Sequence, residues 1–408
     1  MSKKETYIKR ITTFLLTIIM FASCFIPTIA YAEEQNVDAE EAKYLAIACV
    51  WDVQSCTDSF NEEVYYSNVF TLYDSSLNPS AYVVNFKDKN GDPNGYVVIG
   101  ATSDNTEIIE FSDEGLSPYE EQYRETDKVG DEKIYAFFEG NISPTCIDKS
   151  GKNFVEKQNG KLKKTKIREK KSTFKYSVRD RKSKADKIEN LISASGGNSS
   201  SLSASDFPIT SVFDYETGYK TWTMQSVPYF EDVTYKTQND YSDYEEICGP
   251  LAATNLMKYW KRRDSSKYTS LMRGDASWDK TFHDLRGRMH FFNTTSVVLF
   301  ASGVDSFMDE YSSNGATVNW NFPNANNWNT VVTEIGNKRP IVLLLQGHSF
   351  YGYHYVVAFE YLSFEYADGT YSNYVQICDG KSSTANRYIN FTKGFNSGSI
   401  YTITVHPN

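Results

Sequence analysis

The amino-acid sequence predicts an α+β protein of two domains joined by a polar segment. A helix-like stretch followed by strand-like runs occupies residues 33–150, and a basic, then Ser/Gly-rich segment covers 151–205. Helix-like stretches followed by strand-like runs return over 206–408. Helices first and an antiparallel sheet afterwards are typical of α+β folds whose two parts pack side by side. A chain of 408 residues is long enough to bury two such cores.

The first domain is expected to combine one helix with a small sheet. Apolar residues recur on one helical face over 39–53. Three strand-like runs follow at 81–86, 96–100 and 107–112. The first two runs are separated by a stretch dense in Asn, Asp, Gly and Pro, which predicts a hairpin loop.

The second domain is expected to begin with helices and to end with strands. A helix is predicted to start at Cys248, because Pro250 suits a first turn and good helix formers follow it. A short helix is predicted over 328–336, where it ends at a glycine. Strand-like runs then cover 340–345, 354–362, 374–378, 387–391 and 400–405.

Residues 1–32 have the features of a secretory signal peptide. A basic start precedes an apolar core over 14–26, and Ala30-Tyr31-Ala32 offers a cleavage site. The apolar core is too short for a stable membrane span. We therefore expect the protein to be secreted. Five cysteines follow residue 32, an odd and sparse set that argues against a disulfide framework.

Charge is distributed unevenly along the chain. The net charge is −10, yet residues 151–187 contain 15 lysines and arginines against 4 acidic residues. The acidic remainder argues against nucleic acid as a partner. We interpret the basic stretch as a solvated linker that is open to proteolysis, and contact with an anionic cell wall is the alternative.

The motif with the clearest chemical meaning is Cys-Gly-Pro-Leu-Ala-Ala-Thr-Asn at 248–255. A thiol at the start of a helix faces unpaired N–H groups and the positive end of the helix dipole, which favour the thiolate. A thiolate is the nucleophile of cysteine hydrolases. A buried structural cysteine is the alternative, and this motif alone does not separate the two.

A thiolate nucleophile needs a base, and the base needs an orienting acceptor. His354 heads a buried-strand pattern, and Asp379 closes the next strand, so antiparallel pairing would bring the two together. His348 competes for the role of the base but lies in a predicted loop. His283 and His290 are seven residues apart and lack a third metal ligand at suitable spacing.

These motifs resemble those of papain-like cysteine peptidases of the bacteriocin-leader-peptidase-like group. The resemblance rests on 248–255, on Gly-Tyr-His-Tyr-Val-Val at 352–357 and on the strand that ends at Asp379. It implies a papain-like fold for 206–408, with Cys248 as nucleophile, His354 as base and acid, and Asp379 as orienting residue. It implies no metal and no organic cofactor.

Two further features extend or depart from this resemblance. Residues 33–150 are similar to a streptopain-type propeptide, especially at 95–99 and 112–115. The family usually places a Gln before the Cys to stabilise the oxyanion, but acidic residues follow the Val-Pro-Tyr segment where that Gln is often found. Gln238 is the best remaining candidate and Gln225 the next. The N–H of Cys248 itself supplies another donor.

The function that this resemblance implies is that of a secreted bacterial cysteine peptidase made as a zymogen. Residues 33–150 would inhibit the enzyme, 151–205 would be cut, and 206–408 would hydrolyse protein or peptide substrates through a thioester. Two alternatives remain open: a cell-wall peptide amidase with the same triad, and a non-enzymatic surface-binding module on the same fold.

Overall fold

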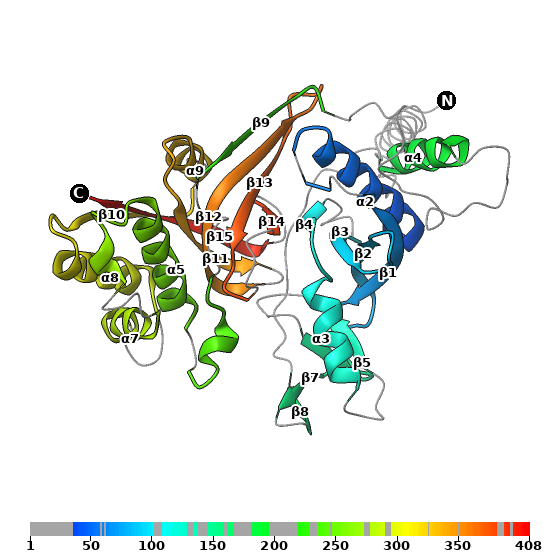
Figure 1. The fold of residues 1–408 in the computed structure, drawn as a ribbon. Helices are drawn as coiled ribbons and strands as arrows, with labels where there is room; N and C mark the ends of the chain where they lie inside the picture. The colour runs from blue at the N-terminus through cyan, green and yellow to red at the C-terminus, as the bar shows by residue number, and fades with distance from the viewer. Residues whose placement is uncertain are drawn as a thin grey trace, which may run out of the picture. The chain divides into compact units, whose positions relative to one another are not determined.

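The architecture is that of a computed structural model (Figure 1). It describes residues 36–57, 59–60, 63–101, 108–128, 134–137, 145–158, 161–166, 181–195, 219–228, 230, 235–244, 247–272, 278–289, 295–324, 326–348, 351–381, 387–391 and 395–408. The predicted signal peptide lies outside these residues. Within them, no helix combines the length and the apolar character needed to cross a membrane.

The N-terminal part contains an antiparallel meander against which a helix packs. Helix α2 (Ala39–Gln54) begins after Asp38, whose carboxylate accepts a hydrogen bond from the N–H of Glu41 at 2.8 Å. The predicted helix and the three predicted strands are confirmed, whereas β1, whose side chains are mostly half-buried, was not predicted. The strands pair in the order β1 (Tyr65–Tyr73), β2 (Pro79–Lys87), β3 (Pro93–Gly100) and β4 (Ile108–Ser112).

Helix α3 (Pro118–Asp127) follows β4. The Ser117 hydroxyl caps it by accepting from the N–H of Glu120 at 3.2 Å, and Pro118 occupies the first turn, where a missing N–H is tolerated. The buried Glu120 carboxylate accepts from Arg124 at 2.6 Å and from the side-chain amide of Asn85 at 2.6 Å. These contacts fix α3 to strand β2.

Part of the segment predicted as a linker has regular structure. Helix α4 packs on α2 through the buried Ile188 and Ile192. The sequence analysis did not predict α4 or the hairpin β7–β8, because the hairpin is rich in lysine and α4 has a narrow apolar stripe. The elements within the predicted linker are β7 (Asn153–Gln158), β8 (Lys161–Lys166) and α4 (Arg181–Ser195). Strands β5 (Ile134–Phe137) and β6 (Thr145–Asp148) precede them, within the predicted first domain.

The C-terminal part begins with a strand and continues with helices. Its first elements are β9 (Thr221–Ser226), η2 (Gln238–Tyr241), α5 (Cys248–Arg263), η3 (Thr269–Leu271), α7 (Trp278–Met289) and α8 (Val297–Tyr311). Helices α7 and α8 both pack against α5. Helix α5 also contacts the long strand β12 (Gly352–Glu365) of the sheet described next.

An antiparallel sheet completes this part. Its strands pair in the order β10-β15-β11-β12-β13-β14. The five strand-like runs and the short helix of the sequence prediction are confirmed, and β10 is an addition. The elements are β10 (Ala316–Asn321), α9 (Asn327–Gly336), β11 (Ile341–His348), β12 (Gly352–Glu365), β13 (Tyr371–Cys378), β14 (Arg387–Asn390) and β15 (Phe395–Pro407).

Aromatic side chains fill the space between α5 and the sheet. Phe230 is fully buried, and its ring stacks on Phe359 of β12 at a centroid distance of 4.3 Å and on Tyr235 at 4.8 Å. Tyr259 of α5 joins the same cluster at 5.5 Å from Phe230. A helical part packed on an antiparallel sheet confirms the predicted α+β fold class.

One ladder connects the N-terminal and C-terminal strands. Strand β4 pairs antiparallel with β14, with Phe111 opposite Tyr388. All fifteen strands of the described residues therefore belong to one hydrogen-bonded sheet. This ladder lies beside the turn that carries Asp379, so it bears directly on the candidate site.

Candidate active site

Cys248 is the first residue of helix α5, as the sequence predicts. Its side chain is largely buried, with 8% of the residue exposed. The main chain after it is tightly enclosed, because a Cβ on Gly249 would lie 2.8 Å from Cγ2 of Thr295. The thiol lies at the N-terminus of α5, where unpaired N–H groups favour its ionised form.

Asn255, the last residue of the cysteine motif, ties three segments together. Its side-chain carbonyl accepts from the N–H of Lys236 at 3.3 Å, and its amide donates to the Lys236 carbonyl at 3.3 Å. The same amide lies 3.5 Å from Sγ of Cys378. Helix α5, the segment before η2 and the end of β13 are thus held in one arrangement.

His354 is buried at the beginning of β12, opposite Leu345 of β11. Its Nε2 lies 2.6 Å from the main-chain carbonyl oxygen of Asp379. Because a carbonyl only accepts hydrogen bonds, Nε2 is the protonated nitrogen, and Nδ1 of the neutral ring keeps its lone pair. The ring stacks on Tyr351 at a centroid distance of 5.3 Å and an angle of 13°. The structure therefore holds an imidazole whose Nδ1 can take a proton.

Asp379 lies beside His354, as the strand pairing predicts, but it makes this contact with its main chain. Its carboxylate accepts from the Tyr351 hydroxyl at 3.0 Å, from the N–H of Lys381 at 2.8 Å and from the guanidinium of Arg387. The expected contact was between the carboxylate and the imidazole. The difference arises because the turn through Gly380, with φ of 68°, brings the Lys381 N–H back onto the carboxylate.

Gln238, the oxyanion candidate, is the first residue of η2. Its N–H donates to the Gly380 carbonyl at 2.7 Å, which connects it to the Asp379 turn. Gln238 and Lys381 line a cavity of about 590 Å³ together with residues of α3. Gln225, the second candidate, lies on β9, where its side-chain oxygen accepts from Lys338 at 3.3 Å. We keep Gln238 as the oxyanion candidate.

The other described histidines have structural partners. His348 is fully buried, and its Nδ1 accepts from the N–H of Tyr351 at 3.3 Å. His406 lies 2.7 Å from a carboxylate oxygen of Glu334. His283 packs edge-on against Tyr244, and His290 is outside the described residues. The described residues contain no cluster of three His, Cys, Asp or Glu side chains suited to a metal ion.

The sequence prediction missed three residues that surround Asp379. Tyr351 contacts both the His354 ring and the Asp379 carboxylate, and Arg387 contacts the Tyr351 hydroxyl at 2.9 Å. The Lys381 side chain lies over the Tyr351 ring at 5.6 Å. Burial lowers the pKa of the Lys381 amine to about 8. None of the three belongs to a motif, so the sequence offers no signal for them.

We expect the free energy of unfolding to fall in acid because of two buried histidines. Burial lowers the pKa of His354 to about 4 and that of His348 to about 3. Both are neutral in the folded chain, whereas the unfolded chain takes up protons below a pH of about 6.5. Above that pH, the two histidines therefore cause no loss in the free energy of unfolding. Toward pH 4, each of the two histidines lowers the free energy of unfolding by up to about 1.4 kcal/mol for every pH unit.

Urea unfolding of the Cys248→Ala chain at several pH values between neutrality and about 5 measures this effect. In the same background, His348→Gln should make the pH dependence shallower, because one titrating ring is removed and other ionisable groups are unchanged. A pH dependence that is identical with and without His348 would contradict a neutral, buried imidazole at this position.

A thiol at a helix start, an imidazole on the facing sheet and an aspartate turn beside it are the arrangement of papain-like cysteine peptidases. Residues 230–396 match the model of the Peptidase_C39 like family, and this segment is a Peptidase_C39-like domain of a cysteine peptidase family. No curated protein matches the sequence. A fragment of prointerpain A from Prevotella intermedia is similar in structure, with 10% identity and a TM-score of 0.35 over 83% of this chain and 98% of that chain.

Proposed function

We propose that the chain is a secreted cysteine peptidase made as a zymogen, with Cys248, His354 and Asp379 as its catalytic residues. The observation that carries the proposal is the hydrogen bond from Nε2 of His354 to the Asp379 carbonyl at 2.6 Å. It leaves Nδ1 as the basic nitrogen. The proposal also rests on Cys248 at the start of α5 in a cysteine peptidase domain.

The first half of the reaction forms a thioester. Sγ of Cys248 passes its proton to Nδ1 of His354, and the thiolate attacks the carbonyl carbon of the scissile peptide bond. The N–H of Cys248 and the side chain of Gln238 stabilise the oxyanion. Nδ1–H then protonates the leaving nitrogen as the C–N bond breaks. The amine product leaves, and the acyl group stays on the sulfur.

The second half releases the acid. Nδ1 takes a proton from water while the water oxygen attacks the thioester carbon. The C–S bond breaks, and the proton returns to the sulfur, which regenerates the thiol and the neutral imidazole. Asp379 holds Nε2–H throughout, and this contact fixes the tautomer in which Nδ1 is basic.

The N-terminal part fits the role of an inhibitor. Glu121, Gln122 and Glu125 of α3 line the same cavity as Gln238 and Lys381. A peptide that approaches Gln238 through this cavity would meet the side chains of α3. The basic segment 151–187 contains many sites at which a peptidase could cut, and 1–32 would direct the chain out of the cell.

Intact mass over time tests the proposal. The chain without residues 1–32 is incubated under reducing conditions, wild type beside Cys248→Ala. We expect the wild type to lose mass by cuts within 151–205 and the variant to stay whole. If the wild type also stays whole, and remains inactive on a denatured protein after trypsin has cut the linker and the N-terminal part has been removed, the peptidase function is wrong.

A further inference from the structure

A buried carboxylate of the N-terminal part reaches the candidate active site. Glu110 of β4 is fully buried, and its Oε1 lies 3.4 Å from Nε of Arg387. The Tyr96 hydroxyl donates to the same carboxylate. Burial raises the pKa of Glu110. A carboxylate placed in this way needs a cationic partner, and Arg387 supplies it.

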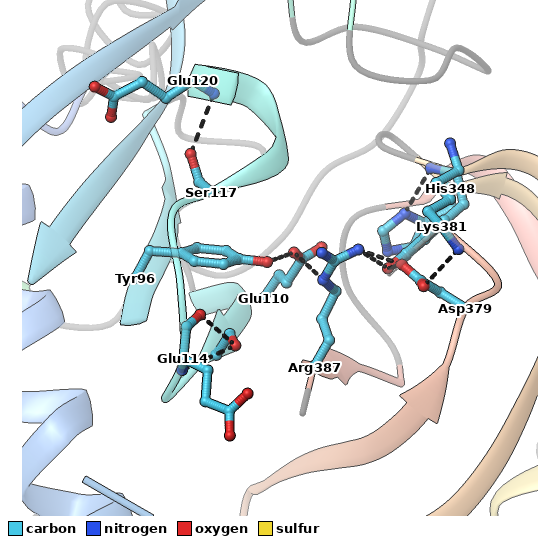
Figure 2. A network of polar contacts seen from close by, with 11 residues as sticks. Tyr96, Glu110, Glu114, Ser117, Glu120, His348, Asp379, Lys381 and Arg387 are labelled. Atoms are coloured by element: carbon cyan, nitrogen blue, oxygen red, sulfur yellow. Dashed lines mark hydrogen bonds and ion pairs between the residues drawn. The ribbon is translucent and has the colours of Figure 1, made fainter. Parts of the chain in front are cut away.

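The guanidinium of Arg387 contacts a second carboxylate. Its Nη1 donates to the carboxylate of Asp379 and, at 2.9 Å, to the hydroxyl of Tyr351. Figure 2 shows Arg387 lying between Glu110 and Asp379. Only 12% of the Arg387 side chain is exposed. One buried cation therefore joins an acidic residue of the N-terminal part to a residue of the proposed triad.

The surrounding strands hold this ion pair in place. In the β4–β14 ladder, Arg387 is opposite Ser112 and Ile389 is opposite Glu110, so Arg387 and Glu110 are diagonal neighbours on one face of the sheet. On the other face, Phe111 stacks on Tyr388 with ring centroids 4.7 Å apart and an angle of 9°. None of these contacts involves residues 151–205, so none depends on an intact linker.

We propose that the Glu110–Arg387 ion pair is the latch that holds the N-terminal part on the active site. The latch would keep the enzyme inhibited after the linker is cut, until the N-terminal part itself is removed. This inference rests on the proposed function. Its physical basis is that removing one partner of a buried ion pair leaves the other charge uncompensated, which strongly destabilises the arrangement that buries it.

The test is the rate at which iodoacetamide labels Cys248 in the uncut chain. Glu110→Gln removes the charge and keeps the shape of the side chain. Two matched variants serve as controls: Glu114→Gln removes an exposed carboxylate four residues away, and Glu120→Gln removes a buried one that pairs with Arg124. Cys49, Cys56, Cys146 and Cys378 are buried cysteines outside any disulfide, and they report on general unfolding.

We expect Glu110→Gln to speed the labelling of Cys248 by at least about tenfold while the four other thiols stay protected. Both controls should remain within about threefold of the wild type. A wild-type labelling rate in Glu110→Gln would overturn the proposal. If Glu110→Gln exposes all five thiols together, the variant has unfolded, and the labelling rate of the shorter Glu110→Asp variant is used to test the latch instead. Faster labelling of Cys248 alone then supports the latch, and a wild-type rate rejects it.

The labelling result is independent of catalysis. Once the N-terminal part is removed, the Glu110→Gln enzyme is identical to the wild type, so its activity on a denatured protein must be the same. If labelling responds to Glu110→Gln but the wild-type chain never cleaves a peptide bond, the latch stands and the peptidase function fails. If the wild type is an active peptidase and labelling does not respond, only the latch fails.

Discussion

Replacing His354 with Ala is expected to lower kcat/KM for peptide hydrolysis by about 10³-fold. The reason is the position of the ring, whose Nε2 is bonded to the Asp379 carbonyl at 2.6 Å while Nδ1 keeps its lone pair. Without this base, the thiol is not deprotonated and the leaving amine is not protonated. The measurement is hydrolysis of a labelled denatured protein by the C-terminal part, after trypsin has cut the linker and the N-terminal part has been removed.

His348→Gln is the matched control for this prediction. Both histidines are buried on the same sheet, but Nδ1 of His348 already accepts a hydrogen bond from the Tyr351 N–H. Gln can accept the same hydrogen bond, so we expect activity within about tenfold of the wild type. If His348→Gln loses as much activity as His354→Ala, the choice of His354 as the catalytic base is wrong.

Asp379→Ala is expected to lower the free energy of unfolding by about 3–5 kcal/mol. The carboxylate is buried and accepts from Arg387, Tyr351 and Lys381, so its removal leaves the guanidinium with one carboxylate partner fewer. Urea unfolding in the Cys248→Ala background measures the loss without self-digestion.

Asp368→Ala is the control for the loss of stability. Its carboxylate also accepts main-chain and side-chain hydrogen bonds in a turn, from the N–H of Thr370 at 2.9 Å and its hydroxyl at 2.6 Å. It is exposed, so a cost of about 1 kcal/mol or less is expected. Equal losses for the two variants would mean that the buried ion pair of Asp379 contributes little.

The strongest sequence patterns correspond to the elements that position the site. Helix α5 starts at Cys248 and β12 includes the predicted 354–362 run, because glycine, proline and long apolar runs are local signals. The helix α4 and the hairpin β7–β8 were missed for the opposite reason. Their lysine-rich sequence is typical of linkers, and only contact with the rest of the fold makes them regular.

The details of the candidate site were less predictable than its residues. Strand order places Asp379 beside His354, but which oxygen of Asp379 faces the ring depends on a turn and on Arg387. Arg387 in turn depends on Glu110, which precedes it by 277 residues in the chain. Pairings of this kind arise only when distant strands meet, and a single sequence has no local pattern that records them.

The β4–β14 ladder has a consequence for the enzyme without its N-terminal part. Strand β14 would lose its pairing with β4 and become the edge of the remaining sheet, with unpaired N–H and C=O groups along it. Such an edge can accept an added strand from another chain and so promote aggregation. Two features limit this hazard: β14 spans only Arg387–Asn390, and it begins with a charged residue.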